Sequence, residues 1–272
     1  MGGGPFGPCR GSAGTGLVAI PRVLHQIWLQ GEREVPERYD DLRRSWKERN
    51  PGWEHRFWDD ASIRALVAGR YPWFLSVYDG YRYLHQRVDS GRYFILYEQG
   101  GVYADLDTEC LRPMDRLLRQ YPRAGLLVSE QPFGPIEMKL IRLVVGARRI
   151  VTNAVMAAAP QAPPLAETIR RLPHAVRRLG FLRELNITYS TGPALLSQAL
   201  DRWSSSDPSV AVVPAACFEP HFGFDLGEHA ESTEVERYVV HSQEATWHAP
   251  FLKDVFESYF KLKNLLRLAD HA

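Results

Sequence analysis

Two carboxylates separated by one residue are the densest chemical signal in this chain of 272 residues. Asp105 and Asp107 follow a short apolar run, residues 102–104, which itself follows two glycines. An extended chain would point both side chains to the same side, about 6 to 7 Å apart. Carboxylates so placed can bind a hard cation such as Mg²⁺ or Mn²⁺, which takes water and phosphate oxygens as further ligands. Because an Asp-x-Asp pair is also common on protein surfaces, the pair alone does not distinguish a metal site from two surface acids.

A pair of opposite charges precedes these aspartates. Asp89 and Arg92 share one face of the helix predicted over residues 82–99, because residues three apart are neighbours on a helix surface. On an exposed helix such an ion pair contributes little stability. Gly91 lies between them and weakens the helix, so we expect it to let a ligand approach the backbone.

The order of several motifs resembles glycosyltransferase family 32, the DXD-containing sugar transferases related to yeast mannosyltransferases and, more distantly, to clostridial glucosylating toxins. One motif block would be weak evidence for this resemblance, whereas an ordered series of blocks over residues 20–250 is specific to the family. The series comprises IPRVLHQIW (20–28), SW (45–46), NPG (50–52), WDD (58–60), DSGRY (89–93), GGVYADLD (100–107), NAVMA (153–157), TGP (191–193), His241 and Trp247.

The resemblance implies an α/β fold of the GT-A type, in which a Rossmann-like, mixed and mostly parallel sheet binds a nucleotide-sugar. It implies a retaining glycosyltransferase that moves a hexose from a UDP- or GDP-hexose donor to a glycan, glycolipid or protein acceptor. It further implies that Mn²⁺ or Mg²⁺ bridges the diphosphate of the donor.

Four residues would contact the donor by their place in these motifs. The resemblance implies that Trp28 stacks on the nucleotide base, although a lone tryptophan is more often a core or strand-end aromatic. Asp89 would accept hydrogen bonds from the donor sugar, and Arg92 would contact the sugar or the diphosphate. Asn153 would face the transferred sugar, unless it merely bonds to a neighbouring backbone group.

The remaining implied residues concern the metal. Asp105 would hold the ribose and a metal-bound water, and Asp107 would ligate the metal directly. His241 follows an apolar run and would supply a late metal ligand. The frequent His-His-Trp pattern is here His-Ser-Gln, so a contact from Ser242, Thr246 or Trp247 to the diphosphate stays open.

The elements that must position these residues alternate between strand and helix, which is typical of an α/β layered domain with a mixed sheet. The patterns predict strands over residues 23–28, 53–58, 102–104, 125–129, 150–157, 210–213 and 238–240, and helices over 36–49, from 60, over 82–99, from 164, after 193 and over 251–268.

The formal net charge of +1 excludes a dedicated nucleic-acid binder, which shows a basic excess. The charges are nevertheless segregated: residues 139–183 hold nine Lys or Arg and one acid, and residues 219–244 hold seven acids and one Arg. Ile169 and Leu172 recur at helical spacing beside arginines. This pattern predicts either a peripheral contact with an anionic membrane or lipid, or a core-facing helix with a solvated arginine face.

Residues 1–19 are rich in glycine, and we expect a disordered leader followed by a single catalytic domain over residues 20–268. The leader lacks the charged start and apolar core of a signal peptide. No run approaches the roughly 18 apolar residues of a membrane span. The expected location is therefore cytoplasmic, with a peripheral membrane contact as an option.

Two other functions fit parts of the sequence. A non-catalytic module could bind nucleotide-sugars with the same fold, although the intact acidic and basic residues argue against it. Residues 105–108, Asp-Leu-Asp-Thr, also resemble DxDxT, a phosphotransferase signature, with the threonine one position early. Gly100 and Gly101 stand where that class needs a buried strand, and no later acid pair is present, so we disfavour it.

Overall fold

The computed structural model describes residues 19–131, 139, 142–143, 145–175, 183–203, 206–218 and 236–241. Within them a six-stranded sheet has the order β2-β1-β3-β6-β5-β7. Its strands are β1 (Val23–Ile27), β2 (Glu54–Trp58), β3 (Gly101–Ala104), β5 (Leu126–Ser129), β6 (Val155–Ala158) and β7 (Val210–Val213). β6 runs antiparallel to both its neighbours, and the other three pairings are parallel. The predicted α/β class with a mixed, mostly parallel sheet is confirmed.

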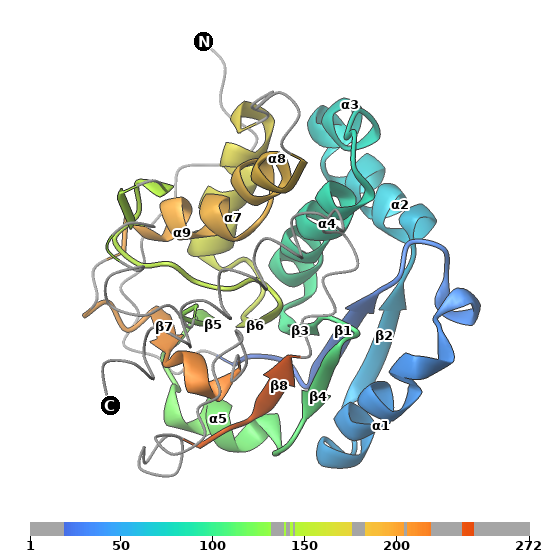
Figure 1. Ribbon diagram of the computed structural model, residues 1–272, viewed down its shortest axis with the longest axis vertical. Coiled ribbons are helices and arrows are strands. Elements are labelled where there is room, and N and C mark those ends of the chain that lie inside the picture. Colours follow the sequence, from blue (N-terminus) through green and yellow to red (C-terminus); the bar gives the residue numbers. More distant parts are fainter. Residues whose placement is uncertain are drawn as a thin grey trace, which may run out of the picture.

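Helices cover both faces of this sheet (Figure 1). One face packs on α2 (Asp60–Arg70), α3 (Pro72–Asp79), α4 (Leu84–Gln99), α7 (Pro163–Arg171) and α9 (Pro193–Leu200), with α8 (Arg183–Ser190) against α9 and α4. The other face packs on α1 (Asp40–Arg49), α5 (Met114–Gln120) and a two-stranded antiparallel sheet of β4 (Thr108–Cys110) and β8 (Val239–His241). Four 3₁₀ turns complete the described elements: η1 (Glu32–Glu34), η2 (Glu37–Tyr39), η3 (Leu172–His174) and η4 (Ala215–Cys217).

Several element boundaries differ from the sequence-based expectation. The helix predicted over 36–49 is divided into η2 and α1, and the strand predicted over 150–157 begins only at Val155. The strand predicted over 238–240 does not join the main sheet, because β8 pairs with β4. The short elements α3, β4, α5 and α8 were not predicted, since each spans too few residues to show a clear hydrophobic period.

Two glycines set the junction between α4 and β3. Gly100 and Gly101 have φ values of +63° and +95°, a backbone conformation that residues other than glycine rarely adopt. A Cβ at Gly100 would lie 2.6 Å from Cδ of Pro160, and one at Gly101 would lie 2.5 Å from the carbonyl oxygen of Val23. The helix therefore stops at the predicted residue, and β3 can lie close between β1 and β6.

Gly91 has a different role from the one expected. A Cβ there would lie 3.0 Å from Cδ1 and 3.1 Å from Cγ2 of Ile63, which belongs to α2. The glycine thus allows α4 and α2 to pack closely, so the expectation that it admits a ligand to the backbone is wrong.

The apolar stripe of the basic segment belongs to the core. Ile169 and Leu172 are fully buried, and Arg170 and Arg171 pair with the buried carboxylate of Glu167 at 2.7 and 2.9 Å. The core-facing alternative is therefore confirmed for α7.

Other sequence-based expectations lie outside the described residues. These are the leader up to residue 18, the rest of the basic segment at 176–182, most of the acidic segment, Trp247 and the helix predicted over 251–268. Among the described helices, none combines the length and the apolar character that crossing a membrane requires.

Candidate active site

Three strands bring the predicted residues to one edge of the sheet. β1 and β3 are parallel and end there, whereas β6 is antiparallel and starts there. Asp105 directly follows β3, and Asn153 precedes β6 by two residues. The backbone N–H of Asp105 donates to the carbonyl of Ala154 at 2.9 Å, which fixes the two chain segments against each other.

Beyond β3 the chain turns, so the expectation that Asp105 and Asp107 lie on an extended segment is wrong. The backbone N–H of Thr108 donates to the carbonyl of Asp105 at 3.3 Å, and the Thr108 hydroxyl donates to the same oxygen. Such hydrogen bonds from a threonine hydroxyl favour turns. The turn brings one carboxylate oxygen of Asp105 and one of Asp107 within 4.8 Å of each other.

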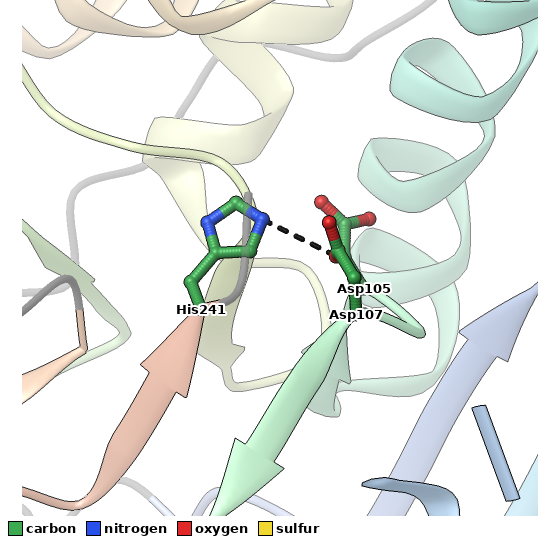
Figure 2. Close-up of side chains that lie close together, drawn as sticks. All are labelled: Asp105, Asp107 and His241. Carbon is green, nitrogen blue, oxygen red and sulfur yellow. Dashed lines mark ion pairs between the residues drawn. The ribbon is translucent and has the colours of Figure 1, made fainter. Parts of the chain in front are cut away.

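β8 adds His241 to this pair of carboxylates. The β4–β8 register places His241 directly opposite Thr108. Its Nε2 lies 3.2 Å from Oδ1 of Asp107. Figure 2 shows the imidazole at the end of β8, turned toward both aspartates. One ligand atom from each of Asp105, Asp107 and His241 lies within 4.8 Å of the others, so the structure brings the three predicted metal ligands together.

This donor set fits a divalent cation. Burial raises the pKa of Asp105 to about 6; the Arg92 guanidinium opposes this rise, and the Asp107 carboxylate adds to it. A cation between the two carboxylates would remove their mutual repulsion and favour the ionised forms. Carboxylates with one imidazole are ligands for Mn²⁺ and related divalent ions.

Beside the carboxylate turn lies a buried polar network centred on Asp89. The side chains of Asp89 and Arg92 are only 9% and 6% exposed, and they form an ion pair at 3.2 Å. Asp89 also accepts hydrogen bonds from Nδ2 of Asn153 and from Oγ1 of Thr191, both at 3.0 Å. Burial nevertheless raises the pKa of Asp89 above its ordinary value, against the effect of Arg92 and the hydrogen bonds. This is not the solvated surface pair that the bare spacing allows.

Arg92 links this network to the carboxylate turn. Its Nη2 lies 3.2 Å from Asp89 and 3.3 Å from Asp105, and its Nη1 donates to the carbonyl of Asn153 at 2.6 Å. Its guanidinium carbon lies 4.6 Å from the ring centroid of Tyr103. Burial lowers the pKa of Arg92, but the neighbouring carboxylates outweigh burial and raise it. The guanidinium therefore stays charged and holds both aspartates in place.

Sequence reasoning missed three members of the site. Thr191 lies in the TGP block, but no role was expected for it. The Tyr93 hydroxyl donates to the carbonyl of Thr191 at 2.8 Å and accepts from Nδ2 of Asn153. The Tyr103 hydroxyl donates to Oδ1 of Asp105. Both tyrosines belong to the motif blocks, but only the folded chain shows where their hydroxyls point.

Trp28 lies one residue beyond β1 and stands apart from the network. Its backbone N–H continues the β1–β2 ladder by donating to the carbonyl of Trp58 at 3.0 Å. Its ring centroid lies 6.1 Å from that of Tyr39, at a tilt of 57°. The structure thus brings six of the eight predicted residues together, places Trp28 at the end of the neighbouring strand, and does not describe Trp247.

Comparison with known proteins gives consistent matches. The protein family described as "Glycosyltransferase sugar-binding region containing DXD motif" matches residues 36–124 of this chain. Inositol phosphoceramide mannosyltransferase 3 of Schizosaccharomyces pombe is 37% identical over 185 residues, which are 68% of this chain and 46% of that protein. Inositol phosphoceramide mannosyltransferase 1 of the same yeast is 33% identical over 212 residues, 76% of this chain and 60% of that protein. The chain spans about half the length of these relatives.

A solved structure, that of mouse xyloside xylosyltransferase 1, is similar over 85% of this chain and 88% of that one, with 12% identity and a TM-score of 0.46. A likeness of this degree carries no conclusion about activity. The matched region of residues 36–124 contains α4, β3 and both aspartates of the turn. The chain therefore belongs to the glycosyltransferases whose sugar-binding region contains the DXD motif, glycosyltransferase family 32.

Proposed function

We propose that this protein is a metal-dependent, retaining hexosyltransferase that uses a nucleoside-diphosphate hexose as donor. The observation that carries the proposal is the meeting of Asp105, Asp107 and His241 with the buried Asp89–Arg92 pair at one edge of the sheet. The relatives' names favour mannose as the sugar and inositol phosphoceramide, a glycolipid, as the acceptor.

The main barrier to glycosyl transfer is the charge that develops on the departing diphosphate. A divalent cation bound by Asp105, Asp107 and His241 would stabilise that charge where it forms. Arg92 keeps Asp105 in place through the 3.3 Å ion pair. Asp89 is held by Arg92, Asn153 and Thr191, so its carboxylate is preorganised to accept hydrogen bonds from sugar hydroxyls.

Retention of the anomeric configuration needs one of two routes. Either a carboxylate acts as nucleophile, or the acceptor attacks the anomeric carbon from the same face that the phosphate leaves. The three carboxylates of the site, Asp89, Asp105 and Asp107, are already engaged by basic side chains at 3.2 to 3.3 Å. We therefore favour same-face attack. The bond from the anomeric carbon to the phosphate oxygen breaks, a bond to the acceptor oxygen forms, and the acceptor proton passes to the departing phosphate.

The first test combines donor choice with metal dependence. The protein is incubated with GDP-mannose, UDP-glucose or UDP-galactose, with and without Mn²⁺, and thermal shift and release of nucleoside diphosphate are measured. We expect one donor to raise the melting temperature and to be turned over only with metal. Transfer is then compared for vesicles containing inositol phosphoceramide and for vesicles containing ceramide alone.

Asp107→Asn should abolish turnover without lowering the melting temperature of the ligand-free protein. Asp115→Asn is a matched control, because Asp115 lies on α5 and pairs with Arg22 rather than with a residue of the site. Wild-type turnover by Asp107→Asn in the presence of metal would refute the site. Binding of donors without any release of diphosphate would instead favour the non-catalytic binding module.

A further inference from the structure

Side chains of α1 bind the edge of β4 that faces away from β8. β8 pairs with one edge of β4, and the other edge of a strand presents backbone N–H and C=O groups that need partners. Nε1 of Trp46 donates to the carbonyl of Thr108 at 3.0 Å, and Oγ of Ser45 accepts from the backbone N–H of Cys110 at 2.8 Å. Figure 1 shows α1 on this side of β4. Two side chains of a helix thus take the place of a third strand.

The indole of Trp46 also reaches the hydroxyl that closes the carboxylate turn. Its Nε1 lies 3.1 Å from Oγ1 of Thr108, so the indole N–H is shared between the hydroxyl and the carbonyl of that residue. The same hydroxyl donates its proton to the carbonyl of Asp105. Because the hydroxyl accepts from Trp46 and donates to Asp105, its orientation is fixed. Trp46 is therefore connected, through one residue, to the turn that brings Asp105 and Asp107 together.

The position of β4 also determines how Asp107 meets His241. Asp107 directly precedes β4, and His241 lies opposite Thr108 in the β4–β8 register. The 3.2 Å separation between Oδ1 of Asp107 and Nε2 of His241 therefore depends on where Thr108 lies. Trp46 contacts Thr108 from the other side, so the strand is held between α1 and β8.

Trp46 is itself held firmly. It is fully buried in the apolar cluster on this face of the sheet. Its carbonyl accepts from Nδ2 of Asn50 at 3.0 Å, and Oδ1 of Asn50 accepts from the backbone N–H of Met114, the first residue of α5, at 2.8 Å. Ser45, Trp46 and Asn50 come from the SW and NPG blocks of the sequence, which do not belong to the carboxylate turn or to the Asp89 network. These blocks thus fix the chain from the carboxylate turn to α5.

We propose that Trp46 is a positioning residue for the metal site. Its N–H holds Thr108, and through Thr108 it keeps the carboxylate turn and His241 in the arrangement that binds a cation. Ser45 supports the same strand at Cys110. The inference rests on the proposed function, which assigns a divalent cation to Asp105, Asp107 and His241. Trp46 acts only through Thr108 and takes no part in bond breaking.

The first test replaces Trp46 by phenylalanine, which keeps an aromatic ring in the apolar cluster and removes the N–H. Binding of Mn²⁺ to the full chain is measured by calorimetry at a temperature where wild type and variant are both folded. The melting temperature of the metal-free protein is measured alongside. We expect the Mn²⁺ affinity to fall roughly tenfold, at the lower end of the range for groups that orient a metal ligand.

Trp53→Phe is the matched control. Trp53 packs in the same apolar cluster, but it lies just before β2. The control should lower the melting temperature and leave the Mn²⁺ affinity unchanged. Equal losses of Mn²⁺ affinity in the two variants would assign the effect to packing of the cluster and overturn the inference.

A double variant tests whether Trp46 acts through Thr108. Thr108→Val keeps the shape of this fully buried side chain and removes the hydroxyl. Residues that act through a shared hydrogen bond do not contribute independently. The loss of Mn²⁺ affinity in the Trp46→Phe, Thr108→Val protein should therefore be smaller than the product of the two single losses. A loss equal to that product would overturn the inference.

Ser45 keeps the inference testable if Trp46→Phe does not fold. Ser45→Ala leaves the apolar cluster intact and should weaken Mn²⁺ binding roughly threefold, as for the loss of one hydrogen bond. Ser45→Thr retains the hydroxyl and should restore the affinity. With Trp46→Phe unfolded, wild-type Mn²⁺ affinity in Ser45→Ala would overturn the inference.

Failure of this inference differs from failure of the proposed function. If the wild-type protein does not bind Mn²⁺, the metal-dependent function itself fails. If the wild type binds Mn²⁺ and Trp46→Phe binds it equally well, with only a lower melting temperature, Trp46 is merely a core residue and only its positioning role is wrong.

Discussion

At the scale of single residues, the site depends on hydrogen bonds that hold buried carboxylates. Asp89 is buried, and its two oxygens are engaged by Arg92, Asn153 and Thr191. A charge this far from water persists only while its partners remain. Removing a hydrogen bond to Asp89 should therefore lower the free energy of unfolding. Removing a hydrogen bond to Asp105 should lower the affinity for the metal.

Thr191→Val keeps the shape of the side chain and removes one donor from Asp89. We expect the free energy of unfolding to fall by about 1.5–3 kcal/mol, as for a hydrogen bond to a charged group, and the pKa of Asp89 to rise further. Urea denaturation measures the first effect. Thr191→Ser retains the hydroxyl and should recover most of the loss; a valine variant as stable as the wild type would contradict this role.

Tyr103→Phe removes the hydroxyl that donates to Oδ1 of Asp105. Groups that orient a metal ligand typically contribute 10- to 100-fold to metal affinity. We expect Mn²⁺ affinity, measured by calorimetry, to fall roughly tenfold. Tyr238→Phe is the control, since the Tyr238 hydroxyl contacts Glu236 and Gln120 rather than the site; equal affinities for the two variants would show that Tyr103 does not orient Asp105.

At the scale of elements, the passage from α4 to β3 determines where the site residues lie. Asp89 and Arg92 are on the helix and Asp105 follows the strand, so any shift of β3 along β1 would separate them. The two glycines permit the close approach of this junction to Pro160 and Val23. Gly91 has the same effect on the α2–α4 contact through Ile63.

Gly100→Ala should destabilise the protein by more than the backbone conformation alone requires. A non-glycine residue at this φ costs about 1–3 kcal/mol, and the Cβ would also collide with Pro160. Gly52→Ala is the matched control, because its φ is +78° and no atom lies within 4 Å of the added Cβ. Urea unfolding of both variants isolates the steric part, and equal losses would show that close packing at Gly100 is unimportant.

At the scale of the whole molecule, His25 joins three parts of the fold near the start of β3. Its Nε2 donates to the carbonyl of Gly100 at 2.9 Å, and its Nδ1 accepts from Nε1 of Trp58 at 3.2 Å. The imidazole is fully buried. It must therefore be neutral in the folded protein, and burial lowers its pKa from 6.5 to about 4.

This pKa predicts a loss of stability in acid. Between pH 6.5 and about 4 the unfolded chain takes up a proton at His25 that the folded chain does not. The contribution of neutral, buried His25 to the free energy of unfolding is fully present above pH 6.5. It is lost as the pH falls toward 4, and the total loss is roughly 3 kcal/mol. Free energies of unfolding in urea at pH 8, 6.5, 5 and 4 measure it. His25→Gln should be less stable at pH 8 yet show a shallower fall; an unchanged slope would contradict the assignment.

Much of this architecture could be predicted because it depends on local patterns. The apolar run of β1, the helix that ends just before Gly100 and the strand that follows are each visible in neighbouring residues. The turn after β3 and the pairing of β8 with β4 were not, because they depend on Thr108 and on a strand 130 residues downstream. The burial of Arg92 between two aspartates likewise arises from packing that no spacing rule contains.

The sequence by itself determined the family, the fold class and six residues that meet at one edge of the sheet, because an ordered series of motifs records chemistry directly. Only the tertiary structure decided how these residues act together. It showed that Gly91 serves helix packing and that Thr191 and Tyr103 hold the carboxylates. The physical reason is that burial and hydrogen bonding are properties of contacts between distant segments, which exist only once the chain has folded.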